Sequence, residues 1–277
     1  TAPVGQDIEF FFDVPNSGKV VMELAVEALD GELTDINNRV VTELAGIRET
    51  LRVLLVSGEP HAGERTWRSL LKSDASVDLV HFTILRPPQK QDGTPIEELS
   101  LIAFPTRELF VEKIDEFDLI IFDRYRRRGV LPGLYFSYMA DYVRAGGAML
   151  LATGPEFAGL RSIASTDLQD ILPTLPTGDV SEEPYRATIT QAGQRHPVTR
   201  RLSGANRTVD DEPSWGRWFR LIEAGPVEGD TLMSEGQGRP VLALRRAEEG
   251  RVGLFLSAHP WLWARDFDGG GPHAQLL

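Results

Sequence analysis

Between residues 51 and 153 the sequence alternates short apolar segments with longer amphipathic ones. Leu51–Ser57, Asp118–Asp123 and Ala148–Thr153 are nearly continuous apolar runs of strand length, and we expect a further strand over residues 78–84. Strands of this kind are buried on both faces, which is typical of a parallel sheet covered by helices. The alternation therefore predicts an α/β fold with a parallel sheet and helices on both faces.

The segments between the strands have the periodicity of helices. Residues 64–72 place Trp67, Leu70 and Leu71 on one face. An amphipathic segment over residues 135–143 stops at Gly146-Gly147, where glycine favours a helix end. A third helix is expected after Thr106, and residues 240–246 and 251–257 predict a hairpin or an adjacent strand pair.

Residues 1–48 have a different pattern, rich in β-branched and aromatic residues. Three strands are predicted, over Ile8–Val14, Lys19–Val26 and Asn38–Leu44. We therefore divide the chain into an all-β segment, 1–48, and an α/β domain, 49–277. Because the first segment carries much apolar area for so few strands, we expect it to pack against the α/β domain or another copy of the chain.

Composition excludes several classes of function. The chain has 29 basic and 41 acidic residues, a net charge of −12, which argues against nucleic acid as a partner. It has no cysteine, so disulfides, thiolate metal sites and thiol nucleophiles are excluded. Its longest apolar runs are strand-sized, so direct membrane insertion is not expected. The start at Thr1 and the stop at Leu277 suggest a piece of a longer protein.

Three segments of the chain resemble a known family: RVLLVSGEPHAG at 52–63, GQRHPVTR at 193–200 and GRVGLFLSAHPWLWARDFDGGG at 250–271. Together with the order of strands, they resemble the class I glutamine amidotransferase-like fold, a flavodoxin-like arrangement. More narrowly, they resemble putative amidotransferase-like domains of uncharacterised bacterial membrane proteins, in which an immunoglobulin-like module precedes. The resemblance implies that residues 1–48 end such a module. It also implies a membrane-anchored parent protein with this part on the extracytoplasmic, periplasmic side of the inner membrane.

The catalytic positions that the resemblance implies are degenerate. An active amidotransferase needs a cysteine at a strand-to-helix turn, a histidine to take its proton, and an acid to orient that histidine. Here the turn carries Gly154 and then Pro155, which has no N–H to serve as an oxyanion donor. The histidine is present as His259, but the following acid is replaced by Trp261. The resemblance thus implies a fold without the family's activity.

Polar residues follow several predicted strands and form a candidate ligand cleft: Glu59, His61, Glu64, Asp123, Arg124, Glu156 and His259. Glu59, His61, Glu64 and Asp123 are oxygen and nitrogen ligands suited to a divalent metal, although a polar loop before a helix explains the first three more simply. The arginines at 124 and 126–128 suit a phosphate or carboxylate, or pairing with surface acids.

Two further groups of residues leave alternatives open. Ser57, Thr153 and Ser257 stand at strand ends and could replace the missing thiol if a base activated one of them. Trp215, Trp218, Trp261 and Trp263 could form a partner or sugar surface, or part of the core.

The sequence thus predicts a non-catalytic binding or scaffold domain. The alternative is a hydrolase or transferase that uses a metal or a hydroxyl nucleophile in the same cleft, carried by Glu59, His61, Asp123 and His259. No cofactor is expected, and the expected partners are other domains of the parent protein or another copy of the chain.

Overall fold

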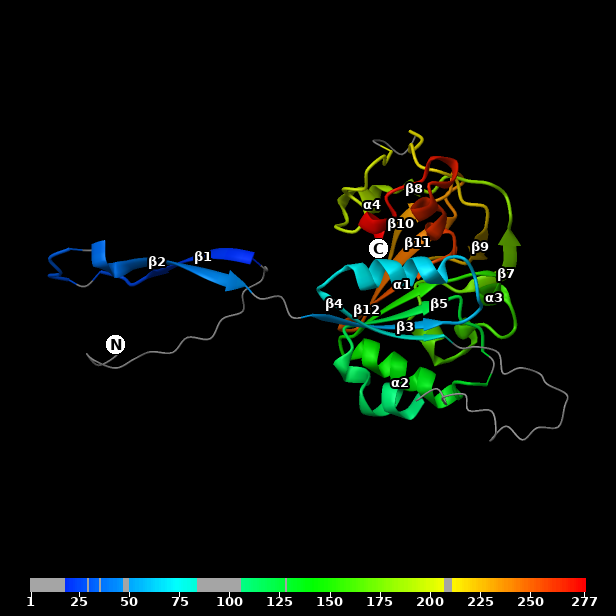
Figure 1. Ribbon diagram of the computed structural model, residues 1–277, viewed down its shortest axis with the longest axis horizontal. Coiled ribbons are helices and arrows are strands. Elements are labelled where there is room, and N and C mark those ends of the chain that lie inside the picture. Colours follow the sequence, from blue (N-terminus) through cyan, green and yellow to red (C-terminus); the bar gives the residue numbers. More distant parts are fainter. Residues whose placement is uncertain are drawn as a thin grey trace. The chain divides into compact units, whose positions relative to one another are not determined.

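The computed structural model describes residues 18–28, 30–34, 36–46, 50–83, 106–127, 129–206 and 211–277. The chain divides into two compact units, Thr1–Thr50 and Leu51–Leu277 (Figure 1). Each unit is described by itself below. Among the described residues, no helix combines the length and apolar character needed to span a membrane.

The first unit contains a β-hairpin. Strands β1 (Gly18–Ala25) and β2 (Arg39–Gly46) pair antiparallel, with Val20 opposite Leu44, and a 3₁₀ turn, η1 (Ile36–Asn38), precedes β2. Two of the three predicted strands are therefore present, and the third, Ile8–Val14, lies outside the described residues. Val21, Val26 and Val41 are 65%, 75% and 64% exposed, so the hairpin does not bury its own apolar side chains.

The second unit is built on an eight-stranded sheet with the order β4-β3-β5-β6-β12-β11-β10-β8. The first five strands of this order are parallel: β4 (Val77–Thr83), β3 (Leu51–Ser57), β5 (Leu119–Asp123), β6 (Ala148–Ala152) and β12 (Gly250–Phe255). The sequence prediction of four parallel strands is confirmed, because β4, β3, β5 and β6 are those four segments.

The sheet continues as an antiparallel half: β11 (Pro240–Ala247), β10 (Asp230–Ser234) and β8 (Thr188–Ile189). The predicted hairpin is confirmed as β11 and β12, with Ala247 opposite Gly250. A separate pair, β7 (Pro176–Ser181) and β9 (Leu221–Ala224), is also antiparallel.

The α-helices are α1 (Glu64–Ser73), α2 (Gly133–Arg144), α3 (Pro155–Ala158), α4 (Gln191–Arg195) and α5 (His273–Leu276). Shorter 3₁₀ turns are η4 (Ile114–Glu116), η5 (Ile163–Ser165), η6 (Asp167–Asp170), η7 (Pro260–Arg265) and η8 (Phe267–Gly269). The helix predicted after Thr106 is mostly a π-helix, η3 (Glu108–Glu112), which buries Leu109 and Phe110.

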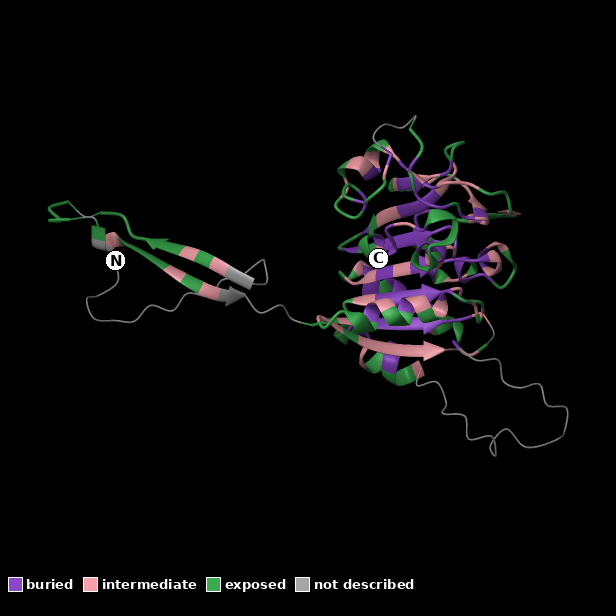
Figure 2. Cartoon of the chain, turned by 45° about the horizontal axis from the view of Figure 1, so that its top comes forward, coloured by how far each residue is buried: buried purple, intermediate pink, exposed green. Residues whose placement is uncertain are grey.

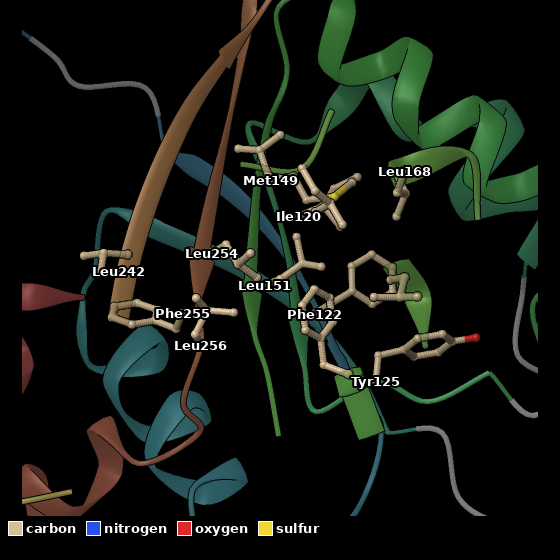
Figure 3. Packing of buried hydrophobic residues seen from close by; sticks show 14 of the residues in the cluster. Ile120, Phe122, Tyr125, Met149, Leu151, Leu168, Leu242, Leu254, Phe255 and Leu256 are labelled. Carbon is tan, nitrogen blue, oxygen red and sulfur yellow. The ribbon is translucent and has the colours of Figure 1, made fainter. Parts of the chain in front are cut away.

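Helices α1 and α2 cover opposite faces of the sheet (Figure 1). Alternate residues along β3 and β5 point to opposite faces, so one set packs against α1 and the other against α2. On one face, Trp67 and Leu71 of α1 pack in a cluster with Val53, Leu55 and Ile121. On the other face, α2 contributes Phe136, Met139 and Val143 to a larger core that contains the strand residues Leu54, Ile120, Phe122 and Leu151. Burial is concentrated on the strands of this sheet (Figure 2), and Figure 3 shows the packing within the larger core.

Three of the four clustered tryptophans belong to this core. Trp215, Trp218 and Trp263 are at most 2% exposed, and the ring of Trp263 lies 5.0 Å from that of Trp215 and 4.7 Å from that of Trp218. The sequence left open whether these tryptophans form a partner or sugar surface or part of the core. These three belong to the core. Trp261 is only half-buried.

Candidate functional site

The predicted cleft lies where four parallel strands end at one edge of the sheet. Ser57 is the partner of Asp123, Asp123 of Ala152, and Ala152 of Phe255. The ladder continues for one residue more, since Gly58 N–H donates to the Asp123 carbonyl and Thr153 N–H donates to the Phe255 carbonyl. Open α/β sheets bind ligands beyond this edge, because the loops that follow the strands meet there.

A buried ion pair fills the turn after β6. Arg124 Nε and Nη2 donate to the two carboxylate oxygens of Glu156 at 3.2 and 3.0 Å, and Gly154 N–H donates to Glu156 Oε1 at 3.1 Å. A Cβ atom on Gly154 would lie 2.6 Å from Arg124 Nε and 2.7 Å from Glu156 Oε1. The ion pair thus occupies the space where a side chain at position 154 would have to stand.

The backbone of this turn is relaxed. Gly154 is extended, with φ −122° and ψ −165°, and Pro155 begins α3. A nucleophile elbow instead holds its residue on a sharp, strained turn. The left-handed residue at this edge of the sheet is Arg124, with φ 48°, in the turn after β5 rather than after β6.

His61 and Asp123 form a buried pair. His61 Nε2 lies 2.7 Å from Asp123 Oδ2, and Gly63 N–H donates to His61 Nδ1 at 3.2 Å, which assigns the proton to Nε2. The second oxygen of Asp123 has no hydrogen-bond partner among the described residues. Burial raises the pKa of Asp123 above its ordinary value, and the hydrogen bond from His61 opposes that rise.

His259 is oriented by the backbone and not by an acid. Phe219 N–H donates to its Nδ1 at 3.2 Å, so the neutral ring carries its proton on Nε2. Burial, together with the charges of Arg220 and Arg124, lowers the pKa of His259 to about 4. Trp261 stands edge-on to the His259 ring at 6.5 Å. No carboxylate therefore takes the orienting role at the position that Trp261 fills.

Glu64 belongs to a separate group on the β4 side. Thr83 Oγ1 donates to Glu64 Oε1 at 2.8 Å, and the same oxygen lies 3.9 Å from His81 Nε2. Ser57 Oγ is 2.9 Å from that His81 nitrogen. Burial is the main cause that lowers the pKa of His81. His81 was not among the predicted site residues, although its position opposite Leu55 in the β3–β4 pair follows from the pairing of the two strands.

Of the four proposed metal ligands, the structure brings His61 and Asp123 together but not Glu59 and Glu64 with them. Glu59 lies 3.7 Å from Arg126, while His61 and Glu64 have the separate partners described above. Among the described residues, no three histidine, aspartate or glutamate side chains are arranged to hold a metal ion. The expected pairing of the arginine loop with acids holds for Arg124 and Arg126. It does not hold for Arg127, whose buried Nε has no hydrogen-bond partner among the described residues, and Arg128 lies outside them.

Two of the three candidate hydroxyls are tied to the backbone. Thr153 Oγ1 donates to the Phe255 carbonyl at 2.7 Å, and Ser257 Oγ donates to the Arg220 carbonyl at 2.6 Å. Among the described residues, neither hydroxyl forms a hydrogen bond with a side chain that could act as a base. Ser257 Oγ also accepts from the backbone N–H of His259 at 3.3 Å. Of the three hydroxyls, only that of Ser57 has a histidine ring nitrogen as a hydrogen-bond partner in the described part of the chain.

A cavity of about 670 Å³ adjoins the Arg124–Glu156 pair. Besides those two residues, its walls include Glu59, Arg126 and Arg161. The size is that of a small-molecule site, but the lining is more charged than most such sites.

The buried neutral His259 predicts a specific pH dependence of stability. An unfolded chain takes up a proton on this histidine as the pH falls through 6.5, whereas the folded chain takes up none until about 4. The contribution of neutral His259 to the stability of the folded chain is therefore fully present above pH 6.5 and is lost as the pH falls from 6.5 to about 4. We expect His259→Asn, which can still accept from Phe219 N–H, to lessen the acid sensitivity by about 2 kcal/mol, allowing for the partial exposure of the ring.

The measurement is urea unfolding at pH 7 and pH 4, followed by tryptophan fluorescence. All five tryptophans lie in the α/β unit, so the signal reports that unit alone. Asp123 acts in the opposite direction, because its raised pKa favours the folded state as the pH falls. Because the unaltered chain and His259→Asn both keep Asp123, the difference between them cancels the contribution of Asp123. Equal pH dependence in both proteins would contradict the assignment to His259.

No protein-family model and no curated protein matches the chain. Solved structures do resemble it. The cytoplasmic protein STM3548 from Salmonella typhimurium is 18% identical, with 82% of this chain and 96% of that chain covered and a TM-score of 0.56. The cytoplasmic protein STM1381 from Salmonella typhimurium LT2 is 14% identical over the same shares, with a TM-score of 0.54. These likenesses show the fold: an α/β domain with a large, mostly parallel sheet.

The expected periplasmic location is wrong by this comparison. Two structures that resemble the chain over 82% of its length are both described as cytoplasmic proteins. The periplasmic expectation was implied by the family resemblance and not by any residue of the sequence, because a chain without cysteine suits either compartment.

Proposed function

We propose that the α/β unit is a non-catalytic binding or scaffold domain with a flavodoxin-like, class I glutamine amidotransferase-like fold. The observation that carries the proposal is the Arg124–Glu156 ion pair in the turn after β6. It stands where the family resemblance would place a nucleophile, and it binds the backbone N–H of Gly154. The site is thus built as a fixed polar surface beside a cavity, without a reactive group. Its partners would be small ligands, other domains of the parent protein or another copy of the chain.

The proposal predicts no glutaminase activity, and none after the simplest repair. Gly154→Cys places a Cβ within 2.7 Å of both members of the ion pair, so we expect a less stable protein that still releases no ammonia from glutamine. The assay is ammonia release by the purified chain, with His259→Asn as the matched control. Ammonia release by the unaltered chain that disappears in His259→Asn would contradict the proposal.

A second function is favoured by one contact. Ser57 Oγ lies 2.9 Å from His81 Nε2, as a hydroxyl nucleophile and its base would. Against it, Ser57 is 1% exposed, and the carboxylate of Glu64 approaches the same ring nitrogen of His81 instead of the opposite one. Labelling by a serine-directed phosphonate probe that is abolished in Ser57→Ala, but not in Ser257→Ala, would favour this hydrolase.

A further inference from the structure

A second and larger cavity, of about 1000 Å³, lies between α1 and β4. Four cationic side chains line it: Arg65, Arg68 and Lys72 from α1, and Arg265 from the end of η7. Among the described residues of its wall, Glu64 is the only acid, and it already accepts a hydrogen bond from Thr83. The cavity is therefore positively charged, in a chain whose net charge is −12.

The three cations of α1 form a row. Positions 65, 68 and 72 are three and four residues apart, so their side chains lie on the same face of the helix. Like charges at this spacing repel one another and destabilise a helix slightly. Within the part of the chain that the structure describes, none of the three makes an ion pair, whereas Arg124, Arg126, Arg144 and Arg239 all do.

Neutral hydrogen-bonding groups complete the wall opposite this row. His81 and Thr83 of β4 line the cavity, and burial holds the pKa of His81 below its ordinary value, so its ring is neutral near pH 7. Guanidinium groups bind phosphate oxygens two at a time, which suits them to phosphate better than to a single carboxylate. The volume admits a molecule of nucleotide size.

We infer that this cavity, which we call the α1 cationic cavity, binds a small phosphate-bearing anion. The inference rests on the proposed binding role of the unit and names the class of its ligand. Arg65, Arg68, Lys72 and Arg265 contact the phosphate oxygens. The ligand removes the repulsion within the row of cations, so binding also stabilises the unit.

The test is isothermal titration of the full chain with inorganic pyrophosphate at low ionic strength, where such contacts are strongest. We expect Arg68→Glu/Lys72→Glu to weaken binding about a hundredfold, because each of the two lost charged hydrogen bonds costs about tenfold. Both positions are exposed on α1, so the change leaves the core intact. The matched control is Arg200→Glu/Arg201→Glu, which makes the same charge change at two exposed arginines outside the cavity.

Three results would overturn the inference: no binding of pyrophosphate, equal loss of affinity in the control, or tighter binding of citrate, which would make the ligand a polycarboxylate. Phosphate release measured in the same samples separates the two proposals. Turnover of pyrophosphate would sink the non-catalytic role while leaving the anion site in place. If pyrophosphate neither binds nor is hydrolysed, the anion site is contradicted and the non-catalytic role is not.

Discussion

Arg124→Met should destabilise the α/β unit by about 3 kcal/mol, the low end of the cost of leaving one partner of a buried ion pair without the other, because this pair is partly exposed. The side chain of Glu156 is 5% exposed, so removing the guanidinium leaves its carboxylate in a largely buried place without its cationic partner. Only Gly154 N–H then remains to donate to that carboxylate in the turn. The measurement is the free energy of unfolding in urea, followed by tryptophan fluorescence.

The control is the double variant Arg124→Met/Glu156→Met, in which neither charge is buried alone. Replacing both partners of a buried pair with apolar groups is often close to neutral. We therefore expect the double variant to recover most of the lost stability. A single variant within about 1 kcal/mol of the unaltered chain would show that water or movement satisfies Glu156, and that the pair does not hold this turn.

Gly58→Ala should be nearly as damaging, although it adds only a methyl group. A Cβ on Gly58 would lie 2.3 Å from the Arg124 carbonyl oxygen and 2.6 Å from the Cα of Tyr125, both of them backbone atoms. The two segments cannot separate freely, because Gly58 N–H donates to the Asp123 carbonyl at 2.8 Å and Glu59 N–H to that of Arg124 at 2.9 Å. We expect a loss of about 3 kcal/mol, in the range of severe overpacking.

Gly133→Ala is the matched control for this change. It makes the same substitution at the first residue of α2, where an added Cβ meets nothing within 4 Å. Alanine favours a helix over glycine, so this variant should be neutral or slightly more stable. If Gly58→Ala unfolds at the same urea concentration as Gly133→Ala, the close approach of β3 to the β5 turn does not constrain the fold.

The sequence predicted the parallel half of the sheet well and the antiparallel half only in part. Buried parallel strands such as β3 and β5 are apolar along their whole length, so they stand out without knowledge of their neighbours. Strand β8 has two residues and β10 has a shifted register, and neither leaves a periodic signal. The π-helix at 108–112 was predicted as an ordinary helix because both bury apolar residues at similar spacing.

The candidate site was predicted as a list of residues and not as a set of contacts. Strand ends pointed to Asp123, Arg124 and Glu156, but the ion pair joins residues 32 positions apart. It forms only because β5 and β6 are neighbours in the sheet. His81 was missed for a related reason, since a histidine inside a strand has no motif around it, and only the pairing of β4 with β3 brings it to Ser57.

The place of β12 in the sheet bears on how the chain folds as it is synthesised. Strand β6 ends at Ala152, but β12, its neighbour on the far side, begins only at Gly250. At about 5–20 residues per second, the growing chain holds four parallel strands with one unpaired apolar edge for roughly 5–20 s. An edge of this kind invites pairing with another chain. We therefore expect this edge to need shielding during that interval, and chains released between residues 153 and 250 to aggregate.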